Sequence, residues 1–139
     1  MNPRFVDTSF LLALSFRRDV NHGRAIALYR SLPKAYLTTE YVLLEYLDGA
    51  AGRATRDVAL KSLDAMRMDS SICIIPTSAD LEAAGLLMYR GRADKEWGLT
   101  DCISFVVMQE HGVTEARTAD HHFEQAGFRA LLRQGGQPL

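Results

Sequence analysis

The sequence has no long apolar run, little cysteine and almost no net charge, and each absence excludes a class of protein. No apolar stretch in its 139 residues approaches the length of a membrane span, and the N-terminal one lacks a basic leader and is interrupted by Asp7. We therefore expect no membrane association and a cytoplasmic location. The formal net charge of -1 gives no general attraction to polyanions, so any nucleic acid must be bound by local clusters of Lys and Arg.

The low number of cysteines and the absence of biased segments in the sequence favour one compact intracellular domain. Cys73 and Cys102 each lie within an apolar run, where a small hydrophobic side chain suits a core. We expect both thiols to be buried, reduced and structural. The sequence has no internal repeat, low-complexity segment or linker rich in Pro, Gly or Ser. Its length suits a single domain over residues 1–139 with a sizeable core.

Short apolar segments alternate with longer segments of helical period. The pattern predicts strands at 4–7, 36–38, 71–75, 115–118 and 130–132. It predicts helices that open at 10–14 and that cover 22–32, 39–49, 56–68, 78–89 and 99–109. Thr8 or Ser9 is expected to cap the first helix, and Thr39 the third. Strands separated by helices indicate a parallel sheet with helices on both faces, so the predicted fold class is α/β.

Five acidic residues stand where such a sheet could form a site. Asp7 and Asp120 follow predicted strands, and ligand sites of open parallel sheets lie beyond the carboxyl ends of the strands. Asp101 lies in the first turn of a helix, Glu45 on a helix, and Asp94 in the polar segment before Asp101. Each acid alone also fits a structural role, as a helix cap, a turn residue or a solvated surface charge.

The chemistry of gathered carboxylates favours a divalent cation. Like charges in one place repel one another, and a cation removes that penalty. Ligands that are all oxygen suit Mg²⁺ or Mn²⁺. A water molecule on such an ion can attack a phosphodiester bond, so no covalent nucleophile is needed.

Four segments of the sequence resemble the motifs of PIN domains. They are FVDTS at 5–9, YVLLE at 41–45, WGLTDCIS at 97–104 and TADHHF at 118–123, which AGF at 126–128 continues. They occur in the family's order and span nearly the whole chain. The resemblance implies a three-layer α/β/α domain with a parallel sheet of four to five strands. One departure is Gly98, which stands where close relatives often have a small hydroxyl residue and leaves any capping role to Thr100.

The resemblance also implies a set of site residues. The catalytic and metal-binding acids would be Asp7, Glu45, Asp101 and Asp120, which would bind Mg²⁺ or Mn²⁺, with Asp94 as an assisting outer ligand. Ser9 and Thr118 match family positions whose hydroxyl groups line the site and orient the acids or waters.

The small size resembles the VapC-type toxins of bacterial toxin–antitoxin pairs. Those are homodimeric ribonucleases that a cognate antitoxin silences by inserting a peptide near the active site. The resemblance thus implies an endoribonuclease that cuts single-stranded RNA by metal-activated water attack and leaves 3′-hydroxyl and 5′-phosphate ends. A housekeeping RNA-processing nuclease and a non-catalytic binding module of the same fold stay open as alternatives. An acid-cluster phosphatase with Asp7 as nucleophile is disfavoured, because Ser9 stands where such enzymes place a second acid.

Two further clusters carry weaker expectations. Arg90, Arg92 and Lys95 surround Asp94 and could contact RNA phosphates beside the acids, although a solvated charged loop fits equally well. For His121 and His122 we expect surface or packing roles, because adjacent side chains diverge and no third His or Cys stands at zinc spacing. The apolar positions of the helix at 56–68 add to the expectation of a homodimer.

Overall fold

The computed structural model describes residues 3–31 and 34–133. In that part of the chain five strands form one parallel sheet in the order β3-β2-β1-β4-β5. The strands are β1 (Arg4–Val6), β2 (Tyr36–Thr39), β3 (Ile72–Ile75), β4 (Glu115–Arg117) and β5 (Arg129–Ala130). The helices are α1 (Thr8–Ser15), α2 (His22–Arg30), α3 (Glu40–Gly49), α4 (Arg56–Met68), α5 (Ala79–Gly91), α6 (Leu99–Glu110) and α7 (His121–Gln125). The α/β fold class predicted from the sequence is confirmed. The predicted end of the second helix, Leu32, lies outside the described residues.

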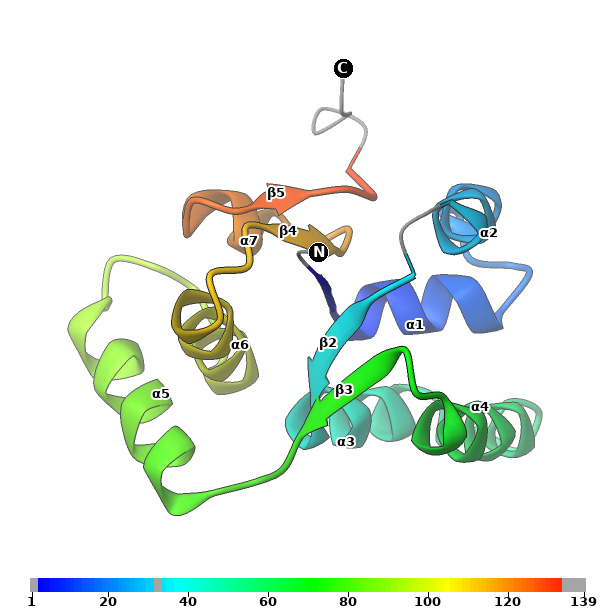
Figure 1. The fold of residues 1–139 in the computed structure, drawn as a ribbon, viewed down its shortest axis with the longest axis horizontal. Coiled ribbons are helices and arrows are strands. Elements are labelled where there is room, and N and C mark those ends of the chain that lie inside the picture. The colour runs from blue at the N-terminus through cyan, green and yellow to red at the C-terminus, as the bar shows by residue number, and fades with distance from the viewer. Residues whose placement is uncertain (1–2, 32–33, 134–139) are drawn as a thin grey trace.

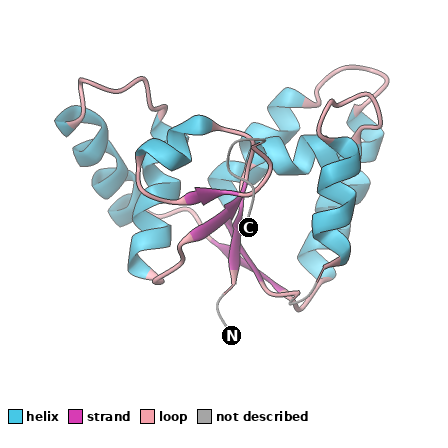
Figure 2. Cartoon of the chain, turned by 90° about the horizontal axis from the view of Figure 1, so that it is seen from above, coloured by secondary structure: helices cyan, strands magenta, loops and turns pink. Residues whose placement is uncertain are grey.

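Helices cover both faces of the sheet. Helices α1, α2 and α4 lie on one side and α5 and α6 on the other, so the strands form a middle layer (Figures 1 and 2). Helix α3 contacts α1 and α4 as well as α6. The central strands are therefore enclosed, and their residues Phe5, Leu37 and Ala116 are almost completely buried. This enclosure explains why β1 and β2 do not alternate between apolar and polar residues as a half-exposed strand would. No helix of the described residues is long and apolar enough to cross a membrane.

The predicted cap of α3 is present, but two other predictions are wrong: Asp7, and not Thr8 or Ser9, occupies the N-cap position of α1, and one of the two cysteines is not buried. Thr39 accepts a hydrogen bond from the backbone N–H of Val42 and caps α3 as expected. Cys102 is buried in α6, but Cys73 is exposed, so the prediction of two buried thiols is wrong for Cys73. Its strand β3 forms an edge of the sheet, where the covering helices do not enclose every side chain.

The order of the strands reverses beside β1. The chain runs from β1 to β2 and β3 on one side, and then returns to place β4 on the other side of β1. In open parallel sheets, ligands bind beyond the carboxyl ends of the strands where the order reverses in this way. Here that point lies between the ends of β1 and β4, which the chain leaves through Asp7 and Thr118.

Candidate active site

Asp7 lies where the strand order reverses, directly after β1. It occupies the N-cap position of α1 but makes no capping hydrogen bond through its side chain. Its Oδ2 instead accepts hydrogen bonds from the hydroxyl groups of Thr118 (2.8 Å) and Ser9 (3.3 Å). The residue is only 4% exposed, and this burial raises the pKa of its carboxyl from 3.8 to about 7. The Thr118 hydrogen bond opposes the rise, and the nearby charges of Asp101 and Glu45 add to it.

Two hydroxyl groups join the first turn of α1 to the segment after β4. Ser9 Oγ lies 3.0 Å from Thr118 Oγ1 and accepts a hydrogen bond from the backbone N–H of Ala119 at 2.9 Å. Thr118 Oγ1 accepts another from the backbone N–H of Asp120 at 3.0 Å. Thr118 is fully buried, so these bonds do not compete with bulk water. The network fixes the carboxylate of Asp7 relative to the backbone of Asp120.

Glu45 approaches the same region from helix α3. Val42, Leu43 and Tyr46 of this helix are buried, whereas Glu45 is exposed. Its Oε1 accepts a hydrogen bond of 2.5 Å from Thr8 Oγ1, and Thr8 is adjacent to Asp7 in the chain. Thr8 is a site residue that sequence reasoning missed, because a Thr after a strand also fits the expected role of a helix cap.

Asp101 and Asp120 form the other half of the acid cluster. Asp101 lies in the first turn of α6, and its Oδ2 accepts a hydrogen bond from the backbone N–H of Gly98 at 3.1 Å. Burial raises the pKa of Asp101, and the charge of Asp120 adds to the rise. Asp120 caps α7, where its Oδ1 accepts a hydrogen bond from the backbone N–H of His122 at 2.9 Å. The capping role expected for Thr100 is therefore filled by Asp101, because the helix begins one residue earlier, after Gly98.

His122 contacts the cluster, so of the two roles expected for it the structure supports packing and not a surface position. Its Nδ1 lies 3.1 Å from Asp101 Oδ2 and 3.2 Å from Asp120 Oδ1, and its side chain is 18% exposed. Its neighbour His121 is 54% exposed and lies farther away, with its Nδ1 3.7 Å from Asp120 Oδ1. The contact between His122 and Asp120 could have been inferred from their spacing, because His122 is the second residue of a helix that Asp120 caps.

Asp94 and the basic residues around it form a separate group. Asp94 is 60% exposed, and its carboxylate is bound by the guanidinium of Arg92 through contacts of 3.0 and 3.1 Å. Lys95 Nζ lies 3.9 Å from the same carboxylate. The hydrogen bond from Arg92 lowers the pKa of Asp94, the opposite of what happens at Asp7. Asp94 is thus already neutralised by protein cations, whereas Arg90 is exposed at the end of α5.

The donor set of the cluster fits a divalent cation. Asp7 is buried and Asp101 is partly buried, burial raises the pKa values of both, and each is affected by the charge of another cluster acid. A cation placed among these carboxylates would relieve the repulsion and offset their loss of hydration. Carboxylate oxygens are the ligands that Mg²⁺ and Mn²⁺ prefer. The side chains of Asp120, His121 and His122 also bring their potential ligand atoms within 4.8 Å of one another.

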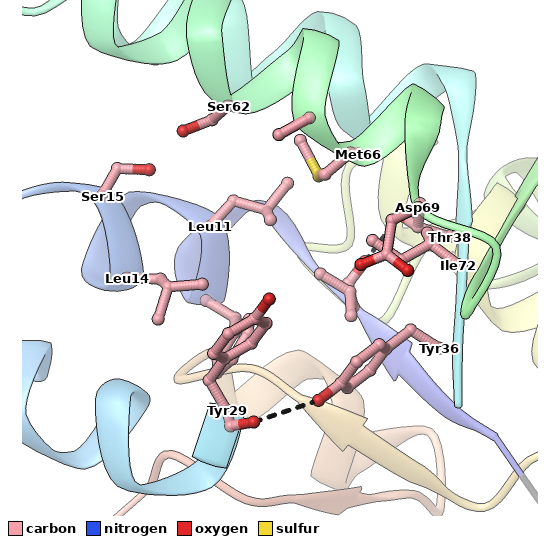
Figure 3. Close-up of a pocket in the computed structure, with 13 residues that line it drawn as sticks. Leu11, Leu14, Ser15, Tyr29, Tyr36, Thr38, Ser62, Met66, Asp69 and Ile72 are labelled. Carbon is pink, nitrogen blue, oxygen red and sulfur yellow. Dashed lines mark hydrogen bonds between the residues drawn. The ribbon is translucent and has the colours of Figure 1, made fainter. Parts of the chain in front are cut away.

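A cavity lies between α1, α2, α4 and the sheet. This cavity of about 190 Å³ is lined mainly by apolar side chains, among them Phe10, Leu11, Met66 and Ile72 (Figure 3). Its polar edge includes a hydrogen bond from the Tyr36 hydroxyl to the carbonyl of Tyr29 (Figure 3). None of the four acids lines it, so it is distinct from the candidate active site.

Comparison with known proteins gives consistent matches over most of the chain. Residues 4–129 match the PIN domain family. The "23S rRNA-specific endonuclease VapC20" of Mycobacterium tuberculosis is 32% identical over 124 residues, which cover 89% of this chain and 94% of that protein. The crystal structure of VapC20, described as a toxin that cleaves the sarcin–ricin loop, aligns with a TM-score of 0.83 over 89% of this chain and 95% of that chain, at 32% identity. FitAcB from Neisseria gonorrhoeae aligns with a TM-score of 0.66 at 17% identity over 88% and 91% of the two chains, which supports the fold alone.

These matches confirm the resemblance found in the sequence. The predicted α/β/α fold agrees with the VapC20 structure. The predicted class of activity, a metal-dependent ribonuclease, is that of the family and agrees with the relative's name. The chain therefore belongs to the PIN-domain family, whose members are metal-dependent nucleases that act on RNA.

Proposed function

We propose that this chain is the endoribonuclease toxin of a toxin–antitoxin pair and that it cuts a loop of ribosomal RNA. The observation that carries the catalytic part is the carboxylate of Asp7, buried at the point where the strand order reverses and affected by the charges of Asp101 and Glu45. Burial of a charged group next to like charges is unfavourable for folding, so such an arrangement favours a function over a structural role.

The four acids are the proposed ligands of the metal ion. A bound divalent ion supplies positive charge for the phosphate and activates a water molecule. The chain's own residues then have distinct tasks: Thr118 and Ser9 orient Asp7, Thr8 orients Glu45, and Gly98 orients Asp101. Water adds to phosphorus and the bond to the 3′-oxygen breaks, so the products carry 3′-hydroxyl and 5′-phosphate ends. Mg²⁺ and Mn²⁺ both suit the oxygen ligands.

The proposed substrate class comes from the similarity to VapC20. That protein is named as specific for 23S rRNA, and its structure is described as that of a toxin cleaving the sarcin–ricin loop. This chain matches it over 89% of its length, and the four acids lie within residues 4–129, the part of the chain that matches the PIN domain family. We expect Arg90, Arg92 and Lys95 to contact phosphates at the rim, since they supply positive charge that the acid cluster lacks.

An RNA cleavage assay tests the proposal. The wild type is incubated with an RNA hairpin that carries the sarcin–ricin loop, in Mn²⁺ or Mg²⁺, beside a hairpin with a scrambled loop. Asp7→Asn and Asp101→Asn should lose at least about 100-fold of the cleavage rate, because each removes a proposed metal ligand. Asp94→Asn makes the same chemical change at a carboxylate already paired with Arg92 and should leave the rate nearly unchanged.

The outcomes separate the parts of the proposal. Undiminished cleavage by Asp7→Asn would contradict the assigned site. Failure of the wild type to cut any RNA with either ion would favour the non-catalytic module. Equal cleavage of the scrambled hairpin would support the nuclease activity but would show that the sarcin–ricin loop is not its specific substrate.

We further propose that the protein forms a homodimer and binds a cognate antitoxin. Helix α5 exposes Leu87 (73%) and Tyr89 (50%), and α3 exposes Leu44 (55%). The first turn of α5 contacts α3, because Glu82 accepts a hydrogen bond of 2.6 Å from the Tyr41 hydroxyl. Large apolar side chains on adjacent helices are typical of a subunit interface. Ribosomal RNA as the substrate agrees with the expected cytoplasmic location.

A further inference from the structure

A hydrogen bond between side chains joins the segment before α6 to helix α7. Trp97 Nε1 donates to Gln125 Oε1 at 3.0 Å, across 28 positions of the sequence. Trp97 is only 6% exposed, and the guanidinium of Arg92 covers one face of its ring at 4.9 Å from the centroid. The donor of this bond is therefore shielded from water, although Gln125 itself is exposed.

Aromatic packing holds the same two elements together. Phe105 of α6 contacts both Trp97 and Phe123 of α7 edge to face, with ring centroids 5.0 and 4.9 Å apart. Phe105 and Phe123 are completely buried. Edge-to-face pairs of this kind favour one relative orientation of the rings. The rings thus orient α6 and α7, and the bond from Trp97 to Gln125 fixes the outer end of their contact.

Each end of this hydrogen bond leads to a proposed metal ligand. The peptide group that joins Trp97 to Gly98 donates its N–H to Asp101 Oδ2 at 3.1 Å, so the position of the indole fixes the donor that orients Asp101. Gln125 is the last residue of α7, and Asp120 is the N-cap of that helix. Because α7 has only five residues, a displacement of Gln125 also displaces Asp120.

The hydrogen bond opposes a repulsion between the two acids. Burial raises the pKa of Asp101 and the charge of Asp120 adds to the rise, so the two carboxylates repel each other when no cation lies between them. We propose that Trp97 and Gln125 are positioning residues whose hydrogen bond holds Asp101 and Asp120 at the separation that binds a divalent ion. This inference rests on the proposed function, since it assumes that the acid cluster binds such an ion.

Titration calorimetry of the full chain with Mg²⁺ tests the proposal. Gln125→Leu removes the acceptor and should raise the Mg²⁺ dissociation constant about 3- to 10-fold, less than the loss of a direct partner of a ligand would. Gln109→Leu, the same change at an exposed residue of α6, should bind Mg²⁺ as the wild type does. Trp97→Phe keeps an aromatic ring but lacks the N–H, so Gln125→Leu should have little further effect in that variant. A general loss of stability would instead add to the effect of Trp97→Phe.

Hydrogen exchange of the indole N–H provides a test without any substitution. Trp97 is the only tryptophan of the chain, so its indole gives a single ¹H–¹⁵N signal. Coupling between two sites is reciprocal, so bound Mg²⁺ should slow the exchange of this N–H by the same factor of about 3 to 10. The measurement is made far below the unfolding temperature, where local opening exposes the group. In Gln125→Leu the exchange should be fast and should not respond to Mg²⁺.

The outcomes separate this inference from the proposed function. If Gln125→Leu binds Mg²⁺ as tightly as the wild type while Asp101→Asn binds it weakly, the metal site stands and the positioning role is wrong. An indole exchange rate that Mg²⁺ does not change in the wild type would lead to the same conclusion. Absence of Mg²⁺ and Mn²⁺ binding to the wild type, or binding that Asp101→Asn does not weaken, would overturn the proposed function and this inference with it.

Discussion

Replacement of Asp7 by Asn should stabilise the metal-free protein at neutral and alkaline pH. Burial raises the pKa of the Asp7 carboxyl from 3.8 to about 7, so the folded protein holds this proton more tightly than the unfolded chain does. As the pH rises from about 4 to 7, the unfolded chain loses the proton first, and the free energy of unfolding falls. Above about pH 7 both states are deprotonated at this group and the penalty stays constant.

The size of the effect follows from the same values. Each pH unit between the two pKa values corresponds to about 1.36 kcal/mol, so the full penalty of a charged Asp7 is about 4 kcal/mol. Between pH 5 and pH 8 it grows by about 2 to 3 kcal/mol. Asparagine has nearly the same shape, can still accept the hydrogen bond from Thr118 and does not titrate. The stability of Asp7→Asn relative to the wild type should therefore increase over this pH range.

Thermal unfolding in EDTA at pH 5 and pH 8 measures this difference. At pH 8 the variant should unfold on the order of 10 °C above the wild type, and by much less at pH 5. Asp94→Asn is the matched control, because Asp94 is exposed and paired with Arg92, and its variant should not gain stability at pH 8. Saturating Mn²⁺ should reverse the order by stabilising the wild type. A pH-independent difference, or a variant that is less stable at pH 8, would refute the reasoning.

Two further substitutions test the hydrogen bond that orients Asp7 and the proposed subunit interface. Thr118→Val removes the hydroxyl group that donates to Asp7 and should weaken Mn²⁺ binding by about 10- to 100-fold in calorimetry. Thr118→Ser keeps the hydroxyl group and should retain most of the affinity. Equal loss of affinity in both variants would argue against a role for this hydrogen bond. Leu87→Arg should convert the dimer to a monomer in sedimentation equilibrium at micromolar protein, because it buries a charge in the proposed α5 interface. Met68→Arg, a change at a similarly exposed residue of α4, should leave the dimer intact; the reverse pattern would place the interface on α4.

The fold and three of the acids could be predicted from sequence because their positions depend on local order. Asp7 directly follows strand β1, Asp120 ends the short segment after strand β4, and Asp101 lies in the first turn of helix α6. A parallel sheet brings such positions to one edge whatever the details of packing. The strands were recognisable by short apolar runs, and even the polar-looking β4 was placed correctly between helices.

The remaining features depend on contacts between side chains, and such contacts cannot be inferred from the spacing of residues in the sequence. Thr8 acts on Glu45, which lies 37 positions away along the chain, and His122 meets Asp101 across 21 positions. Asp94 lies within two residues of both Arg92 and Lys95 in the sequence, but only the structure shows that its carboxylate is paired with Arg92. The exposure of Cys73 followed from the position of β3 at the edge of the sheet, which an apolar run does not reveal.

The pairing of β1 with β4 also sets the order in which the active site can assemble. The ribosome makes Asp7 well before the residues that complete its surroundings, because the hydroxyl group that orients it belongs to Thr118 and the next acid of the cluster is Asp120. At about 5 to 20 residues per second, the ribosome needs on the order of 10 s to make the chain between them. During that interval the first acids have no β4 beside them and no complete cluster. The acid cluster is therefore incomplete in a growing chain until Asp120 has been made.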